Sequence, residues 1–306
     1  MTILADGNTR IIVQGITGRE AASFTKDMMD YGSKVVAGVT PGKGGWNVHG
    51  VPVYDSVRQA VSQQPANTSI ISVPPAGVKG AAFESLEAGM KLVVIVTERV
   101  PRRDVVEVLE YAKEAGAVVV GPNSLGLICP HTVKVGMAGG PASDVKKAYS
   151  PGGVGIISRS GGMTTEIANL LTTHGIGQST CISIGGDPVV GSNFLDLIPL
   201  FDKDPETRAV VIFCEPGGTG EERLAEYVLE KRPNLPIIAF VAGQFADEMP
   251  GVRFGHAGAI VEGDRGSTKV KIEKFRWAGI HVAKQFSDIV DLVKTHARRK
   301  IGERSS

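Results

Sequence analysis

The sequence has few cysteines, and none of them has the spacing of a metal or redox site. Cys129, Cys181 and Cys214 form no CxxC or CxxH pair and lie among apolar residues. Such cysteines are typical of buried thiols rather than of disulfides or metal ligands. We therefore predict no bound metal and a reducing compartment, namely the cytoplasm.

Long hydrophobic runs and an excess of either charge are lacking as well. No apolar stretch approaches the ~20 residues needed to cross a bilayer, and the amino terminus lacks the apolar core of a signal peptide. Lys and Arg total 33 against 32 for Asp and Glu, so no overall field attracts nucleic acid or anionic lipid. These absences predict a soluble protein that binds neither membranes nor nucleic acid.

Short β-branched runs alternate with amphipathic stretches in the first half of the chain. Apolar residues at three- and four-residue spacing predict helices within residues 20–32 and 105–116. Continuous apolar strands between such helices indicate a parallel sheet covered on both faces. The predicted strands cover residues 10–14, 34–40, 69–73, 92–97 and 117–121.

The alternation begins again after a passage rich in Gly, Pro and Lys at residues 139–153. We place a domain boundary in this passage, because a chain of 306 residues is long enough for two domains of ordinary size. The fold class is therefore α/β, with one domain over 1–140 and a second over 150–306. Strands of the second domain are predicted at residues 153–158, 179–185, 209–214 and 235–241.

The turn after the first strand, QGITGRE (14–20), predicts a phosphate-binding loop. Gly15 and Gly18 allow a tight turn whose N–H groups face an anion at the start of the next helix. A fold that binds NAD usually ends its second strand with an acidic residue, but Lys43 follows this one. A nicotinamide-dependent oxidoreductase is thus disfavoured, and coenzyme A, which carries an additional phosphate, is favoured.

The same region does not encode a nucleoside triphosphate site. The stretch GVTPGKG (38–44) is one residue shorter than a P-loop between its glycines, and Gly44 stands where Ser or Thr is required. The sequence therefore contains no recognisable NTP-binding motif.

The second half contains two further strand-to-helix turns that can bind anions. Ser160, Gly161 and Gly162 follow a strand and open a helical pattern, which predicts a helix N-terminus with free N–H donors. A second such N-terminus is predicted within residues 215–222, where Glu215 ends the preceding strand. Phosphate and carboxylate groups are the ligands that such sites favour.

His256 stands between an Arg-Phe-Gly sequence and an apolar run in RFGHAGAIVEG (253–263). A turn histidine is one interpretation of this glycine-flanked position. The other is an accessible imidazole that carries a phosphoryl group, near a helix N-terminus and a carboxylate. The remaining histidines lack this setting and are predicted to lie in turns or at the surface: His49, His131, His174, His281 and His296.

A resemblance to a known family covers nearly the whole chain. In order, the segments that carry it are QGITGRE, GVTPGKGGWNVHGVPVYDSV, IVTERVP, GPNSLGLI, VGIISRSGG, IGGDPVVGSNFLDLIPLFDKDPET and RFGHAGAI. The sequence resembles the alpha subunit of NDP-forming succinate–CoA ligase. The resemblance implies a Rossmann-like CoA-binding domain, then a flavodoxin-like ligase domain that carries a phosphohistidine.

The resemblance also implies an activity and a partner. Succinate, CoA and an NTP would be converted to succinyl-CoA, NDP and phosphate, and the NTP and Mg²⁺ would be bound by a beta subunit with a nucleotide-grasp fold. The complex would be αβ or α2β2. A CoA-binding sensor module is the alternative outside the ligases, but it does not account for the residues around His256 and Ser160.

The family's site residues can be transferred to matching positions of this sequence. His256 is then the phosphorylated residue and Glu215 its neighbouring carboxylate, while Ser160, Gly161, Gly162 and Thr165 face the acid substrate or phosphate. The implied CoA contacts are Thr17, Gly18, Arg19, Glu20, Lys43, Val96, Thr97 and Glu98.

Three positions differ from the typical alpha subunit. Thr165 replaces a substrate-contacting tyrosine, Ser124 replaces a cysteine, and Pro216 follows Glu215. SRSGGM and FGHAGA are also similar to segments of ATP-citrate lyase. Succinate is the expected acid, and malate, citrate or another di- or tricarboxylate is the alternative.

Overall fold

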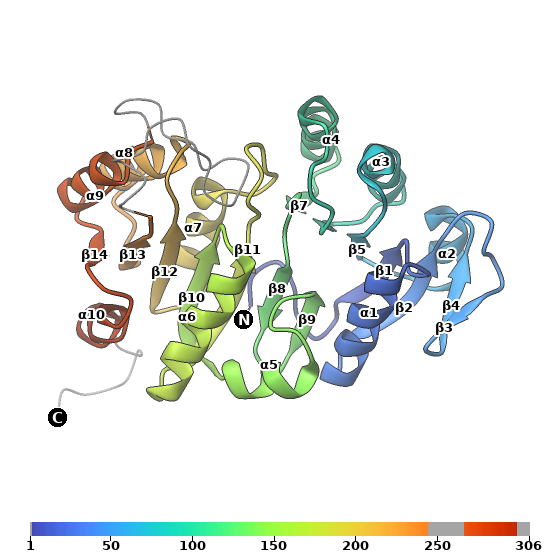
Figure 1. Ribbon diagram of the computed structural model, residues 1–306, viewed down its shortest axis with the longest axis horizontal. Coiled ribbons are helices and arrows are strands. Elements are labelled where there is room, and N and C mark those ends of the chain that lie inside the picture. Colours follow the sequence, from blue (N-terminus) through green and yellow to red (C-terminus); the bar gives the residue numbers. More distant parts are fainter. Residues whose placement is uncertain (1, 244–265, 299–306) are drawn as a thin grey trace.

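The computed structural model describes residues 2–243 and 266–298, which form two α/β units, each built on a seven-stranded sheet. Figure 1 shows the two sheets side by side, with helices packed over them. The predicted strands are confirmed, with shifts of a few residues at their ends.

The first sheet has the strand order β3-β4-β2-β1-β5-β6-β7. Apart from the short antiparallel β3, its neighbouring strands are parallel, and the order from β4 to β7 is that of a Rossmann fold. The strands are β1 (Arg10–Gln14), β2 (Lys34–Val39), β3 (Asn47–Val48), β4 (Val51–Tyr54), β5 (Thr68–Ile71), β6 (Leu92–Ile95) and β7 (Val118–Val120). The helices are α1 (Arg19–Tyr31), α2 (Val57–Gln63), the 3₁₀ turn η1 (Pro75–Gly77), α3 (Val78–Glu87) and α4 (Arg102–Glu114).

The second sheet has the order β14-β13-β12-β10-β11-β8-β9. Its five strands from β14 to β11 are parallel and have the flavodoxin-like order. The strands are β8 (Gly126–Cys129), β9 (Val133–Gly136), β10 (Pro151–Ser158), β11 (Gln178–Ser183), β12 (Ala209–Cys214), β13 (Ile237–Val241) and β14 (His281–Ala283). The helices are α5 (Ala142–Ala148), α6 (Gly161–Thr173), α7 (Phe194–Lys203), α8 (Gly220–Lys231), α9 (Thr268–Trp277) and α10 (Asp288–His296).

The chain changes sheets earlier than the passage in which we placed the domain boundary. The hairpin of β8 and β9 precedes residues 139–153, yet β8 pairs antiparallel with β11 of the second sheet. Its residues are buried on both strands, because the hairpin extends a sheet whose faces are covered. Sequence periodicity could not assign it, since a short apolar run does not indicate which sheet it joins.

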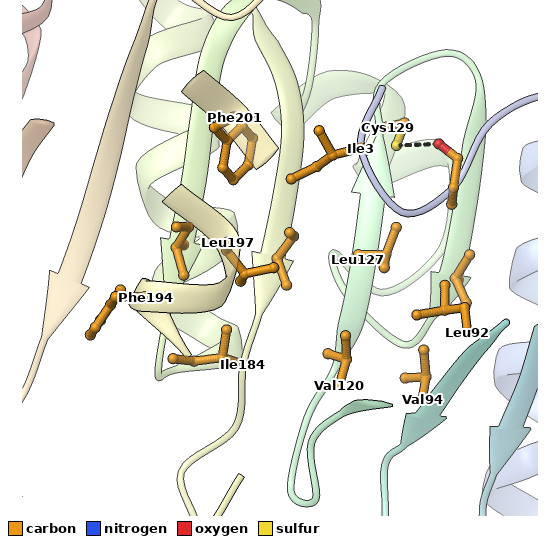
Figure 2. Close-up of a cluster of buried hydrophobic side chains, with 14 of the residues drawn as sticks. Ile3, Leu92, Val94, Val120, Leu127, Cys129, Ile184, Phe194, Leu197 and Phe201 are labelled. Carbon is orange, nitrogen blue, oxygen red and sulfur yellow. Dashed lines mark hydrogen bonds between the residues drawn. The ribbon is translucent and has the colours of Figure 1, made fainter. Parts of the chain in front are cut away.

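One hydrophobic cluster crosses the contact between the two units (Figure 2). Val94 and Val120 come from the first sheet, and they pack in the same cluster as Leu127, Ile184 and Leu197 of the second unit. Each of these side chains is at most 2% exposed. The two sheets therefore share a continuous core.

The cysteines lie in the core as predicted. All three are free and buried, and burial raises the pKa of the Cys129 thiol to about 11. Among residues 2–243 and 266–298, no cluster of three or more His, Cys, Asp and Glu side chains is placed to bind a metal ion. None of the helices in these ranges is long and apolar enough to span a membrane.

Lys134 on β9 is completely buried where α1 of the first unit packs on the second. Its backbone N–H donates to Ser33 Oγ at 2.9 Å, and Ser33 Oγ donates to the Lys134 carbonyl at 2.8 Å. Its Nζ donates to the carbonyl of Gly140. Burial lowers the pKa of Lys134 to about 8, although the Asp27 carboxylate partly opposes this shift.

We expect Lys134→Met to change how the free energy of unfolding depends on pH. The pKa of this group falls from 10.5 in the unfolded chain to about 8 in the fold, so between these values the unfolded state binds more protons and wild-type stability rises with pH. The stability of the variant relative to wild type should thus be greatest near pH 7 and decline by at most roughly 3 kcal/mol toward pH 10.5. Urea unfolding of both proteins at these pH values measures the difference, and a pH-independent difference would contradict the prediction.

Candidate functional site

A two-lobed cavity lies at the carboxyl edge of the first sheet. The larger lobe has a volume of about 640 Å³ and the smaller about 570 Å³, and Gly18, Ser72 and Val73 line both. In open α/β sheets, ligands bind outside the carboxyl ends of the strands. The two lobes together are large enough to hold a large cofactor or substrate.

The structure brings seven of the eight predicted CoA contacts to this cavity. Gly18, Arg19, Glu20, Val96, Thr97 and Glu98 line the larger lobe, and Thr17 lines the smaller one together with Gly18. These residues come from two loops that are far apart in the sequence, after β1 and after β6. Parallel strands bring the loops together because both leave the same edge of the sheet.

The loop after β1 depends on Gly15. Its φ is +79°, and a Cβ at this position would lie 2.1 Å from the carbonyl oxygen of Ser72. Gly15 N–H donates to Val39 O at 2.7 Å, and Gly18 N–H then donates to Gly15 O at 2.9 Å. The loop thereby turns tightly into α1, whose first N–H groups have no side-chain cap at Gly18 and can donate to an anion.

Lys43 is the predicted contact that the structure does not bring to the cavity. Its ammonium lies 4.1 Å from the centroid of the Trp46 ring, in a turn where Lys43 N–H donates to Thr40 O at 3.0 Å. Thr40 itself lines the smaller lobe. Lys43 is therefore one turn away from the cavity, stacked on an indole ring that is 53% exposed.

The wall of the larger lobe that faces the second unit was not predicted from the sequence. Asn123, Leu125 and Met137 form this wall. Asn123 Nδ2 donates to Asp187 Oδ1 at 2.9 Å, and Arg159 Nη2 donates to the Asp187 carbonyl at 3.3 Å. Asn123 and Asp187 are far apart in the sequence, so no local pattern could have linked them.

The N-terminus of α6 forms as predicted and adjoins this wall. Ser160 is the N-cap, and its Oγ accepts from Met163 N–H at 3.4 Å. A Cβ at Gly161 would lie 2.2 Å from Leu125 Cγ, whereas the nearest atom to one at Gly162 is Ser160 Oγ at 4.0 Å. Gly161 therefore allows the helix to pack directly against the cavity wall, while Gly162 faces open space.

The second predicted N-terminus, that of α8, differs from that of α6 in the side chains of its first turn. Its first turn contains Glu221 and Glu222, both buried. The first turn of α6 contains Gly161, Gly162 and Met163, which are uncharged. Because acidic side chains already occupy the positive end of the α8 dipole, an incoming anion is favoured at α6.

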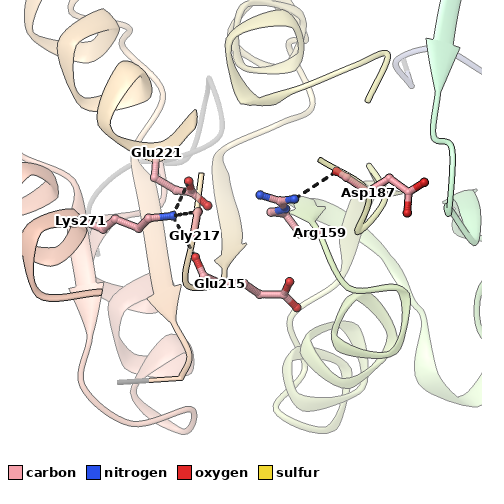
Figure 3. A network of polar contacts seen from close by, with 6 residues as sticks. All are labelled: Arg159, Asp187, Glu215, Gly217, Glu221 and Lys271. Carbon is pink, nitrogen blue, oxygen red and sulfur yellow. Dashed lines mark hydrogen bonds and ion pairs between the residues drawn. The ribbon is translucent and has the colours of Figure 1, made fainter. Parts of the chain in front are cut away.

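Glu215 follows β12 at the same edge of the second sheet (Figure 3). Its carbonyl accepts from Lys271 Nζ at 2.9 Å, while its side chain extends to the side on which Arg159 lies. Gly217 and Gly218 continue the turn with φ values of +82° and +66°. The structure therefore places a carboxylate, a guanidinium and the N-terminus of α6 around one edge of the sheet.

Thr165 is directed into the packing of α6 on the preceding segment. Its hydroxyl lies 2.9 Å from the hydroxyl of the buried Tyr149. This hydrogen bond gives Thr165 a structural partner, and its contact with substrate stays a prediction.

His256 lies outside the described residues, but the ends of the segment that contains it are described. A Cβ at Gly243 would lie 2.7 Å from Pro216 Cγ, and Gly217 N–H donates to Gly266 O at 2.8 Å. Gly243 and Gly266, the last and first described residues around that segment, therefore both contact the turn that follows Glu215.

Both units match known protein families. Residues 6–99 match the CoA binding domain family, and residues 157–281 match the CoA-ligase family. The chain is 46% identical over 294 residues to succinate–CoA ligase [ADP-forming] subunit alpha 1 of Archaeoglobus fulgidus, covering 96% of this chain and 98% of that one. It is 43% identical over 283 residues to a subunit of an ADP-forming sulfoacetate-CoA ligase from Acholeplasma sp, covering 92% of this chain and 94% of that one.

A solved structure with the same arrangement is that of ATP citrate lyase from Methanothrix soehngenii in complex with citrate and coenzyme A. Its TM-score is 0.88 at 25% identity, over 99% of this chain. The present chain spans about half the length of that enzyme, 53%.

We expect alanine at the two adjacent glycines of α6 to change the free energy of unfolding by different amounts. The Cβ in Gly161→Ala would overlap Leu125 and should reduce the free energy of unfolding by about 1–3 kcal/mol. Gly162→Ala, with open space around the Cβ, should be neutral or stabilising by up to ~1 kcal/mol. Chemical denaturation of the two variants measures this contrast, and equal effects would show that the contact with Leu125 does not constrain α6.

Proposed function

The chain belongs to the family of succinate–CoA ligase alpha subunits, and on this basis we propose that it forms succinyl-CoA together with a beta subunit. In the proposed reaction, succinate, CoA and an NTP give succinyl-CoA, NDP and phosphate. The observation that carries this proposal is the continuity between the cavity at residues 17–20 and 96–98 and the N-terminus of α6, through the packing of Leu125 on Gly161. A thiol bound in the cavity would thereby be close to an anion bound at the helix.

His256 is the proposed phosphoryl carrier. The imidazole would take the γ-phosphoryl group of the NTP as NDP leaves, and would transfer it to a succinate carboxylate to give an acyl phosphate. Attack of the CoA thiolate on the acyl carbon would then release phosphate. The glycine-flanked sequence supports this role, as does the contact of Gly243 and Gly266 with the turn after Glu215.

Residues of the described sites would each contribute to these steps. The N–H groups of α6 at Gly161 and Gly162 would stabilise the phosphoryl group in transit, because they lie at the positive end of the helix dipole. Glu215 would accept a hydrogen bond from the imidazole and so fix its orientation and tautomer. The loops after β1 and β6 would hold CoA along the cavity.

The beta subunit would supply the NTP site and Mg²⁺, in an αβ or α2β2 complex. The absence of a P-loop from the sequence supports this division, and so does the designation of several relatives as alpha subunits. A nucleotide-grasp fold for that partner and a cytoplasmic location complete the proposal. The three free, buried cysteines support a reducing compartment.

Succinate is the proposed acid, with malate, citrate or a related acid as the alternative. The succinate–CoA ligase relative is 46% identical and the sulfoacetate-CoA ligase relative 43% identical, so similar chains belong to enzymes named for different acids. Since the Thr165 hydroxyl is bonded to Tyr149, any influence of Thr165 on the acid would act at the side of α6 rather than at its N-terminus.

Replacing the proposed phosphoryl carrier should abolish turnover but preserve CoA binding. In the purified complex, His256→Ala should acquire no acid-labile, base-stable label from γ-labelled NTP, whereas CoA affinity should match wild type because the cavity lies in the first unit. His174→Ala, at an exposed position after α6, is the control and should label normally. A CoA sensor would show no label even in the wild type, and labelling of His256→Ala would assign the phosphoryl group to another residue.

Lys43→Ala tests whether this lysine contacts a CoA phosphate. Losing a charge-assisted contact of about 1.5–3 kcal/mol should raise the KM for CoA roughly tenfold to a hundredfold, with little change in the KM for NTP. Lys91→Ala is the control, since this exposed lysine precedes β6 at the opposite edge of the sheet. If the two variants have the same KM for CoA, Lys43 serves only to pack on Trp46.

A further inference from the structure

Lys271 on α9 is fully buried, and each N–H group of its ammonium donates a hydrogen bond. Its Nζ donates to Glu221 Oε2 at 2.8 Å, to the Glu215 carbonyl at 2.9 Å and to the Gly217 carbonyl at 2.5 Å. The side chains of Lys271 and Glu221 are both 0% exposed. An ammonium has three N–H groups, so each has an acceptor (Figure 3).

A buried ion pair of this kind is not needed for stability alone. Removing two charges from water is costly, and well-packed apolar residues of similar volume often replace such a pair without loss. Two of the three hydrogen bonds of Lys271 go to backbone carbonyls of a single turn. The Lys271 ammonium therefore constrains the backbone conformation of the turn that contains Glu215 and Gly217.

The turn lacks the regular hydrogen bonds of a helix or strand. It connects β12 to α8 and contains Pro216 between the two carbonyls that Lys271 contacts, followed by left-handed Gly217 and Gly218. Gly217 N–H is held by Gly266 O, and Gly266 is followed by Ser267, the N-cap of α9. The start of α9 thus holds the turn from one side through a backbone hydrogen bond and a lysine.

We propose that Lys271 is a positioning residue that fixes the Glu215 carboxylate in the orientation required for phosphoryl transfer. Because Lys271 holds the carbonyls on both sides of Pro216, it sets the peptide planes that determine where the side chain of Glu215 leaves the backbone. The Glu221 carboxylate balances the charge and keeps the ammonium in place. The inference rests on the proposed function, because it concerns the carboxylate that would orient His256.

The test compares the same substitution at two buried lysines in the alpha chain copurified with its beta subunit. Lys271→Met removes the donor to the turn, and Lys134→Met removes a buried lysine that donates to Gly140 O at the contact between the two units. The readout is the single-turnover rate of phosphoryl labelling from γ-labelled NTP at a temperature at which both variants are folded. We expect Lys271→Met to be slower by roughly tenfold to a hundredfold, as for a small misplacement of a reacting group, and Lys134→Met to be within about twofold of wild type.

A double-mutant cycle with Glu215→Gln separates positioning from general loss of structure. If Lys271 acts through Glu215, Lys271→Met should have little further effect on the labelling rate once Glu215 is Gln. The affinity for CoA should be unchanged in all of these variants. If Lys271→Met yields too little folded protein, Lys271→Met/Glu221→Leu removes both charges and takes its place in the cycle.

The outcomes for the inference and for the proposed function can be distinguished. No label in the wild-type complex would overturn the proposed function, and with it the premise for Lys271. A labelled wild type with equally fast Lys271→Met would overturn the inference alone. Multiplicative effects of Lys271→Met and Glu215→Gln would overturn it as well, because the lysine would then act independently of the carboxylate.

Discussion

Residues 121–125, which connect the two sheets, hold the loops of the candidate site in place. Gly121 has a φ of +95°, and a Cβ there would lie 2.2 Å from Ile95 O, so the chain leaves β7 pressed against β6. Asn123 N–H then donates to Thr97 O in the first unit, while Asn123 O accepts from Gly186 N–H in the second. One short segment therefore fixes the cavity loop after β6 to the loop after β11.

This connection also explains why the cavity in the first unit lies next to the N-terminus of α6 in the second. Leu125 lines the larger lobe and packs on Gly161 at the start of α6, and Asn123 reaches Asp187, whose carbonyl accepts from Arg159. A relative displacement of the sheets would break these contacts and expose part of the shared core around Val120 and Leu127. Hydrophobic burial of that core thus keeps the cavity aligned with the helix.

Charge distinguishes two helix ends that look alike in the sequence. Both α6 and α8 follow a parallel strand and begin at a glycine, and the N-terminus of any helix carries a partial positive charge. The first turn of α8 contains the acidic side chains of Glu221 and Glu222, and Lys271, from a helix that comes later in the chain, forms an ion pair with Glu221. The uncharged first turn of α6 is consequently the more favourable place for a phosphate or carboxylate.

Local sequence patterns were sufficient to predict the α/β class, the strands at positions such as 10–14 and 209–214, the loop at Gly15 and Gly18 and the cap at Ser160. These features are local, because strand periodicity, a tight turn and a helix N-cap depend on residues only a few positions apart. In contrast, packing of the two units places the 126–136 hairpin in the second sheet, which no local pattern indicates. The same packing pairs Thr165 with Tyr149 and brings Lys271 to the carbonyl of Glu215. Each of these contacts joins residues from different elements, so it forms only when those elements pack together. The packing that is adopted buries apolar area and leaves few buried polar groups without partners, and both terms depend on the whole chain.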